Sequence, residues 1–539
     1  MTPSAADPKQ KLQKDTVLRA SAVVFFFLVG AKALNFIKKI LIGKLFGVST
    51  VADAFFAASF LPYYSAIFFE GVIFLGFLPL FSQVMAEKGW EEAKQFMTEI
   101  FLLIALLTSV LVGFGWWAGP WVIGQLVPGF KAQEQALTLS LFQVLSLVVV
   151  FISLTSFFKA LNSYFEDFAW AASSGLVDAL TMVGITLLTW RSWGIYGAAW
   201  GAVGGVATAL LLQAVFLFRK RKLLPGRFVP QNSSLLKLFY FLIPMAVIWG
   251  FQQIPLVILN RFGSGMWEGT ISALTISQTL TTVPMGLVSH TVLFAVFPTL
   301  AKQASNGASG DGAKETFFQT LRGGFLILVP VGFLMTALAH PVAALFFSGG
   351  GISGEGTRRI ANSLTCFGWA TFALYADLFM TQSLIAVRKT FPAILLSGSR
   401  AALTYAMGYV LSTVWDYQGL ALSFSIALVV NLFLLFPIFF RMSPFTRAWT
   451  PLFRYTGKLA LASSPLLLMG WLVNRYSILQ WMRLTKVETI GFLGLGCLAG
   501  GGIYLLLLSW LKVDEMRSVL EELKRGWARK GWWLAEPSE

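Results

Sequence analysis

Three polar side chains lie on one face of a segment that is otherwise apolar enough to cross a membrane. Lys32, Asn35 and Lys39 are spaced i, i+3 and i+7, which places them on one stripe of a helix, with Lys38 beside it. On translocon scales a lysine near the bilayer centre costs roughly 2.5–3.5 kcal/mol, so we expect the stripe to face a wet cavity or a bound anion. The alternative is that Lys38, Lys39 and Lys44 extend to the lipid headgroups.

Two carboxylates follow in the next apolar segment. Asp53 ends the sequence Ser49-Thr50-Val51-Ala52-Asp53, a good helix start, so it is either an N-terminal cap of that helix or a substrate contact. Glu70 lies deeper, beside Gly71, where it is placed to pair with a lysine of the first segment. Both carboxylates are candidates for setting the lysine geometry or for gating the outer side of a cavity.

Three charged residues in later segments are candidates for ion coupling: Asp178, Asp377 and Arg400. Either the aspartates pair with Arg400, which is a structural arrangement, or they carry a coupling proton or sodium ion. Elsewhere, Gln252 and Gln253 precede Arg261 in another apolar segment and add polar groups. A polar cavity with a cationic wall suits an anionic substrate.

Several kinds of chemistry are not expected. His290 and His340 have no acidic or cysteine partner at ligand spacing, so we expect neither a metal site nor histidine catalysis. No Gly-Lys-Ser/Thr loop that would cradle a nucleotide occurs. Cys366 and Cys497 lie in apolar runs and imply no disulfide framework. We therefore expect no enzyme, no metal and no bound cofactor.

The composition indicates a polytopic integral membrane protein. Of 539 residues, 56% are hydrophobic and only 12% are charged. The net charge of +16 arises mainly from short loops and tails, as the positive-inside rule predicts, so no nucleic-acid partner is expected.

Runs of about 20 apolar residues predict an all-α fold with about fourteen transmembrane helices. The second is interrupted by Pro62 and by Glu70-Gly71, which predicts a kink or break there. The expected extents are 20–45, 50–84, 97–117, 135–160, 169–190, 194–218, 236–259, 269–300, 317–346, 358–386, 392–414, 418–440, 455–474 and 488–511.

Two pairs of similar motifs indicate an internal repeat. Phe77-Leu78-Pro79-Leu80-Phe81 matches Val296-Phe297-Pro298-Thr299-Leu300, and Gly194-Ile195-Tyr196-Gly197-Ala198 matches Gly419-Leu420-Ala421-Leu422-Ser423 at nearly the same separation. They predict two six-helix lobes with a substrate site between them. The expected divisions are 1–234 for the first lobe, 235–445 for the second, 446–511 for two extra helices, and 512–539 for an amphipathic tail on the membrane surface.

Basic residues also predict the orientation. They cluster in both tails, in the loop with Arg219-Lys220-Arg221-Lys222 and in the loop with Arg441 and Arg447. An even number of spans puts all four segments on one side, so both termini are expected in the cytoplasm. Lys38 and Lys39 then lie toward the outer end of the first span, against the orientation rule, which favours the cavity interpretation.

Seven motifs resemble those of the MurJ/MviN family of lipid II flippases. They are Leu41-Ile42-Gly43-Lys44-Leu45-Phe46-Gly47, Ala52-Asp53-Ala54-Phe55-Phe56, Phe69-Glu70-Gly71, Phe77-Leu78-Pro79, Leu161-Asn162-Ser163-Tyr164, Gly269-Thr270-Ile271-Ser272-Ala273-Leu274 and Pro284-Met285-Gly286-Leu287. The resemblance implies the fold of the multidrug/oligosaccharidyl-lipid/polysaccharide exporters, with a V-shaped pair of lobes and a groove beside helices 13 and 14 for a polyprenyl tail.

The resemblance also implies a function. The protein is expected to move a polyprenyl-diphosphate-linked cell-wall glycan precursor, lipid II first, across the bacterial inner membrane by alternating access, driven by sodium, protons or the membrane potential. Cell-wall synthesis enzymes are possible partners alongside the lipid-linked substrate and the phospholipid bilayer. The alternatives are export of another lipid-linked oligosaccharide or polysaccharide, a cation-coupled drug exporter of the same fold, and a scaffold without transport activity.

The sequence departs from the family pattern at the cavity. Lys32 and Lys38 stand where arginine is usual, and Lys39 stands where an acid is usual. Ser65-Ala66-Ile67 replaces an arginine pair, and Thr279 replaces another arginine. Because lysine lacks the two-pronged guanidinium fork, a diphosphate would be held differently by this chain.

Overall fold

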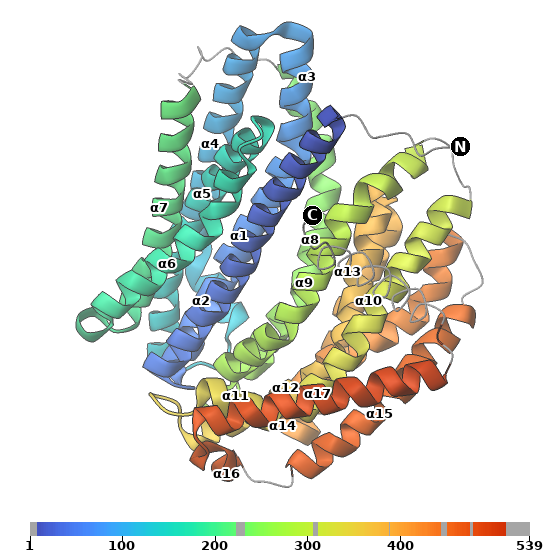
Figure 1. Ribbon diagram of the computed structural model, residues 1–539. Coiled ribbons are helices and arrows are strands. Elements are labelled where there is room, and N and C mark those ends of the chain that lie inside the picture. Colours follow the sequence, from blue (N-terminus) through green and yellow to red (C-terminus); the bar gives the residue numbers. More distant parts are fainter. Residues whose placement is uncertain are drawn as a thin grey trace, which may run out of the picture. The chain divides into compact units, whose positions relative to one another are not determined.

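The chain is almost entirely helical (Figure 1). The computed structural model describes residues 8–221, 232–305, 311–387, 389–442, 450–474, 478–511 and 513. Within these ranges there is one isolated β-bridge, between Gly349 and Ile352, and no strand. The expected all-α polytopic fold class is confirmed. The expected amphipathic tail, apart from Val513, lies outside the described residues, as do the loop residues 222–231 and 443–449.

The chain forms two compact units. The first contains the described residues up to Ile276 and the loop Gly349–Gly356. Within it α2 packs on α5, while α6 packs on both α1 and α7. Its elements are α1 (Pro8–Phe46), α2 (Thr50–Val72), the π-helix η1 (Ile73–Phe77), α3 (Leu78–Lys88), α4 (Trp90–Leu126), α5 (Ala132–Tyr164), α6 (Phe168–Trp193), α7 (Ile195–Arg221) and α8 (Asn232–Gly263).

The second unit contains the described residues of Ser277–Ser348 and those from Thr357 onward. Here α10 packs on α13 and α15, α13 packs on α14, and α15 packs on α17. Its elements are most of α9 (Thr270–Ser305), then α10 (Asp311–Ala337), α11 (Ala339–Phe347), most of α12 (Gly354–Gly368), α13 (Thr371–Ala386), α14 (Thr390–Met442), α15 (Thr450–Asn474), α16 (Ile478–Arg483) and α17 (Lys486–Trp510). The lobe boundary expected at residue 234 stays a prediction.

Ten helices in the described ranges are long and apolar enough to cross a membrane, which makes the chain a multi-pass membrane protein. Their outward faces are apolar. On α4 a stripe at helical spacing is strongly exposed, and α17 carries a similar one. Contact of such faces with lipid tails costs no free energy of desolvation, because the tails are as apolar as the side chains. The stripe on α4 is formed by Leu102, Leu106, Val110, Phe114, Trp117 and Trp121.

Most of the expected spans lie inside single helices to within a residue or two, but three of them are interrupted. The second span stays α-helical through Pro62 and becomes a π-helix at η1, just after Glu70-Gly71. In a π-helix the backbone hydrogen bonds run from residue i to residue i+5. The expected span 317–346 is divided at Leu338 into α10 and α11, and 358–386 is divided after Gly368 into α12 and α13. The boundary expected between 392–414 and 418–440 is confirmed, because Trp415 and Asp416, inside the element labelled α14, have non-helical backbone angles that separate two helices.

Glycines on α7 allow α6 to approach closely. Gly197, Gly201 and Gly205 are spaced four apart and form one face. A Cβ atom on Gly205 would lie 2.6 Å from both the backbone oxygen and Oδ1 of Asp178, which no real structure tolerates. Small residues on this face of α7 therefore permit the close packing of α6.

We predict that Gly205→Ala destabilises the protein, because the added methyl group forces α6 and α7 apart. Overpacking of this kind typically costs about 1–3 kcal/mol. Gly184→Ala on α6 is the matched control, because a Cβ there meets nothing within 4 Å. That variant should be neutral or more stable by up to about 1 kcal/mol, because alanine favours helix. Thermal unfolding in lipid nanodiscs checks both, and equal effects would contradict the packing argument.

Candidate substrate site

The polar stripe of α1 keeps an open face in the first unit. Lys32 and Asn35 are exposed and Lys39 is half-buried, whereas Lys38 is buried. This difference follows from the helical period, because successive residues of a helix point in different directions. Lys38 therefore points away from the face that carries Lys39. The stripe therefore remains a candidate for contact with a ligand, and Lys38 is separated from it.

Lys38 forms an ion pair with Asp178 of α6. Its Nζ lies 2.7 Å from Asp178 Oδ2, and the two side chains are only 7% and 16% exposed. This position corrects two expectations: Lys38 does not line the open face of α1, and the partner of Asp178 is Lys38 rather than Arg400. A buried carboxylate needs a nearby cation, and α1 is the neighbour that supplies one.

Glu70 of α2 pairs with Lys159 of α5, one turn before η1. The Nζ–Oε1 distance is 2.5 Å, and the side chains are 22% and 34% exposed for Lys159 and Glu70, respectively. Lys32 of the first segment interacts with Glu70 electrostatically, as expected, but the direct ion pair of Glu70 is with Lys159 of α5, which was not expected. Together Lys32, Glu70 and Lys159 form an accessible group, which we call the cationic cluster, with one surplus positive charge.

Lys159 was missed by sequence reasoning because the expected helix ended at residue 160. In the structure α5 continues to Tyr164, so Lys159 lies more than a turn inside the helix. The available signal was a lysine between Phe157-Phe158 and Ala160-Leu161, with apolar residues on both sides. Such a lysine requires a carboxylate or an anion nearby.

Asp53 is buried and holds the start of α9. Its Oδ2 accepts a hydrogen bond from Gly269 N–H at 2.8 Å, and its Oδ1 accepts one from Ser272 N–H at 2.6 Å. The cap of α2 itself is Ser49, whose hydroxyl accepts from Ala52 N–H at 3.4 Å. The prediction that Asp53 caps its own helix is therefore wrong, since Asp53 caps a helix more than 200 residues further along the chain.

Three glycine-containing turns pack together beside this cap. Gly269 has φ +85°, and a Cβ on it would lie 2.5 Å from the backbone oxygen of Val48. Gly351 N–H donates to the Lys44 carbonyl at 2.7 Å, and a Cβ on Gly47 would collide with Gly351. The turns after α1, α8 and α11 thus close one end of the first unit around Asp53.

The polar residues of α8 divide into two groups. Trp249 lies 3.7 Å from where a Cβ of Gly71 would stand, so α8 passes close to Glu70. Gln252 and Gln253 follow one turn later and are half-buried. Arg261 instead donates to Gln125, at 2.7 Å to its backbone oxygen and 3.2 Å to Oε1. Arg261 therefore links α8 to α4, a contact the sequence did not indicate.

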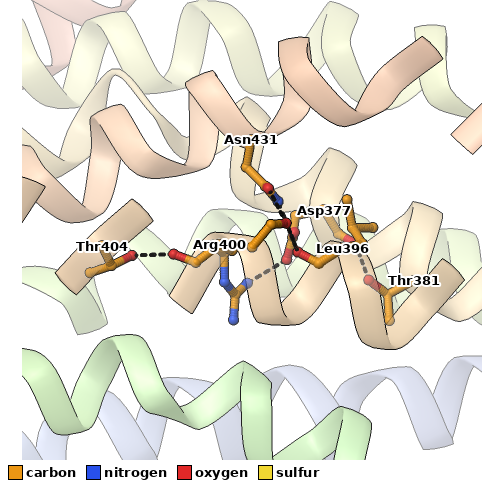
Figure 2. A network of polar contacts seen from close by, with 7 residues as sticks. Asp377, Thr381, Leu396, Arg400, Thr404 and Asn431 are labelled. Atoms are coloured by element: carbon orange, nitrogen blue, oxygen red, sulfur yellow. Dashed lines mark hydrogen bonds and ion pairs between the residues drawn. The ribbon is translucent and has the colours of Figure 1, made fainter. Parts of the chain in front are cut away.

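In the second unit Asp377 of α13 pairs with Arg400 of α14 (Figure 2). Both side chains are almost completely buried, at 6% and 7% exposure. The expected pairing of Asp377 with Arg400 is confirmed. In the described part of the chain, no group of three or more His, Cys, Asp or Glu residues could hold a metal ion.

Apolar helices around interior ion pairs and interrupted spans are the architecture of a multi-pass membrane transporter. Solved structures support this fold. One entitled "Lipid II flippase MurJ, inward closed conformation" matches with a TM-score of 0.72 and 19% identity over 92% of this chain and 98% of that chain. A multidrug resistance MATE transporter matches with a TM-score of 0.64 and 14% identity over 79% of this chain and 98% of that chain.

The sequence comparisons identify the family. The model of the lipid II flippase MurJ family matches residues 42–488, and the chain belongs to this family. A probable lipid II flippase MurJ of Rhizobium tropici is 24% identical over 92% of this chain and 95% of its own length. The lipid II flippase MurJ of Burkholderia cenocepacia is 21% identical over 78% of this chain and 83% of its own length.

We predict that Asp53→Asn destabilises the protein more than Ser49→Ala does. The asparagine loses the negative charge that accepts two backbone N–H groups, and hydrogen bonds to a charged group contribute about 1.5–3 kcal/mol each. Ser49→Ala removes only the long cap bond of α2, for which about 1 kcal/mol is typical. Thermal unfolding of the two variants provides the comparison. A larger loss for Ser49→Ala would show that Asp53 does not hold α9.

Proposed function

We propose that this protein moves lipid II across the bacterial inner membrane by alternating access, without catalysing a covalent step. Membership of the MurJ family supports the class of substrate. The observation that carries the proposal is the cationic cluster of Lys32, Glu70 and Lys159, which is accessible and has a surplus positive charge. A lipid-linked diphosphate is the complementary anion.

Each member of the cluster has a distinct part. Lys32 and Lys159 attract the diphosphate, each as a compact charge with three N–H donors. Glu70 holds the Lys159 ammonium in place at 2.5 Å and reduces the net charge, so that the substrate is attracted and can still leave. Asn35, exposed one turn along α1 from Lys32, offers an amide to the glycan.

The end of the first unit around Asp53 serves as its outer gate. Opening requires the hydrogen bonds from Gly269 and Ser272 to Asp53 to break or to move as one body. The apolar faces of α15 and α17, where Leu468 and Leu498 are strongly exposed, accommodate the polyprenyl tail. Both termini lie in the cytoplasm under this proposal.

The membrane potential favours transport in the outward direction. With the inside negative, moving one negative charge outward through 100 mV is worth about 2.3 kcal/mol, and a diphosphate carries more than one. A drug exporter would bind cations, which the surplus positive charge of the cluster opposes. Docking of cell-wall synthesis enzymes stays a prediction.

A second candidate substrate is another polyprenyl-diphosphate glycan. The feature that favours it is the departure from the pattern that the family resemblance implies, since Ser65, Ala66, Ile67 and Thr279 stand where arginines are expected. A lysine ammonium attracts a diphosphate as a point charge, and it lacks the planar fork with which arginine recognises the geometry of a phosphate. A leaflet assay in proteoliposomes with defined lipid-linked sugars separates the two candidates, because the rate depends on the glycan only when the protein recognises it.

We predict that the double variant Lys32→Gln/Lys159→Gln flips lipid II at least about tenfold more slowly. The change removes two cations and leaves Glu70 to repel the diphosphate, and a charged hydrogen bond contributes about 1.5–3 kcal/mol. The leaflet assay measures the rate, and complementation of flippase-depleted cells measures the function in vivo.

The control for this variant is Lys88→Gln, which removes a lysine paired with Glu92 on an exposed helix end. It should flip lipid II at the wild-type rate. If the double variant, present at normal amounts in the membrane, flips every polyprenyl-diphosphate glycan as fast as the control, the cationic cluster is not the substrate site.

A further inference from the structure

The second unit buries a carboxylate that is only partly satisfied by hydrogen bonds. Asp377 is 5% exposed as a whole residue. Its Oδ2 accepts a hydrogen bond from Arg400 Nη1, as Figure 2 shows, while its Oδ1 has no hydrogen-bond partner in the described part of the chain. A charged carboxylate in this position is stable only because a cation lies against it.

The elements that carry this pair also present several oxygen atoms. Ser399 Oγ donates to Asn431 Oδ1 at 2.7 Å. Asn431 Nδ2 donates to the Leu396 carbonyl at 3.0 Å (Figure 2). Both residues belong to α14, which bends at Trp415 and Asp416 so that its two halves pack together. Carboxylate, amide, hydroxyl and carbonyl oxygens are the ligand types that hard metal cations prefer.

We infer that Arg400 is a built-in counter-cation, which occupies at Asp377 the place that an exchangeable sodium ion would take. The guanidinium is tethered to α14 and is always present, whatever the ion concentration outside. It cannot lose its proton in a protein, so its charge persists throughout the cycle. A sodium ion at the same carboxylate would meet a positive charge at close range and is excluded.

The first unit neutralises its buried aspartate in the same way. Lys38 of α1 lies 2.7 Å from Asp178 of α6, and both side chains are largely buried. The two aspartates that the sequence marked for ion coupling therefore each face a cation of the chain itself. If the proposed flippase function holds, neither aspartate is available to couple a sodium ion to transport. The assignment of Arg400 does not itself depend on that function.

The test compares the purified full-length wild type with Arg400→Ala and with the matched control Arg400→Lys. Thermal unfolding in nanodiscs is measured in sodium, lithium, potassium and choline chloride at equal ionic strength. We expect the wild type and Arg400→Lys to unfold at the same temperature in sodium as in choline. Arg400→Ala should unfold at a lower temperature in choline and recover with sodium in a saturable manner. The neutral variant Asp377→Asn/Arg400→Ala should show no such recovery.

Two outcomes would overturn the inference. One is an Arg400→Ala variant that folds but gains nothing from any small cation relative to choline. The other is sodium-specific stabilisation of the wild type that disappears in Asp377→Asn/Arg400→Gln. If Arg400→Ala does not fold, binding of radioactive sodium decides: wild-type binding that requires Asp377 refutes the assignment, and its absence supports it. None of these readouts measures lipid flipping, so failure here is distinguishable from failure of the proposed function.

Discussion

An ionised side chain within a membrane-spanning helix has no bulk water to solvate it and must meet an opposite charge on another helix. Among the residues that the structure describes, the requirement is met by Lys38 with Asp178, by Lys159 with Glu70, and by Arg400 with Asp377. Each pair joins two different helices, so it also selects their neighbours. Removing one partner of a buried pair typically costs about 3–5 kcal/mol, which makes Lys38–Asp178 and Arg400–Asp377 strong constraints on the fold.

Accessibility separates the pairs into two kinds. The Lys38–Asp178 and Arg400–Asp377 pairs are buried within their units, and the charges within each pair cancel, which suits a structural role. Glu70–Lys159 is open, lies just before the π-helix η1, and has Lys32 as an additional charge. A π-helical turn shifts the register of the side chains that follow, and such turns are frequent at functional sites. Charge that is accessible and in excess can attract a lipid diphosphate, whereas sealed charge cannot.

The motifs shared with the MurJ family also gain a physical meaning. Asp53, in one motif, binds the backbone of Gly269 and Ser272, in another, so two segments far apart in the chain form a single clamp. Gly269 is required because its φ is positive and its neighbour Val48 leaves no room for a Cβ. Asn162, in a third motif, donates to Gln213 at 2.6 Å within the core of the first unit. These motifs specify closures and packing more than substrate contacts.

The sequence by itself determined the features that depend on neighbouring residues in the chain. The multi-pass, all-α class follows from the length of the apolar runs, and most of the expected spans lie inside single helices because hydrophobic length is a local property. Stripe geometry on α1 is equally local, which is why Lys32, Asn35 and Lys39 were correctly placed together.

Only the tertiary structure decided which charges meet. The partners of Glu70, Asp178 and Asp53 lie on helices whose proximity depends on packing, for instance on the glycine face of α7 that brings α6 close. The sequence did not indicate Lys159, because a lysine near a helix end is normally explained by snorkelling. In the structure α5 is longer than its apolar run, so Lys159 lies inside the helix. Pairing across helices is set by three-dimensional contact, and a periodic pattern within one helix carries no record of it.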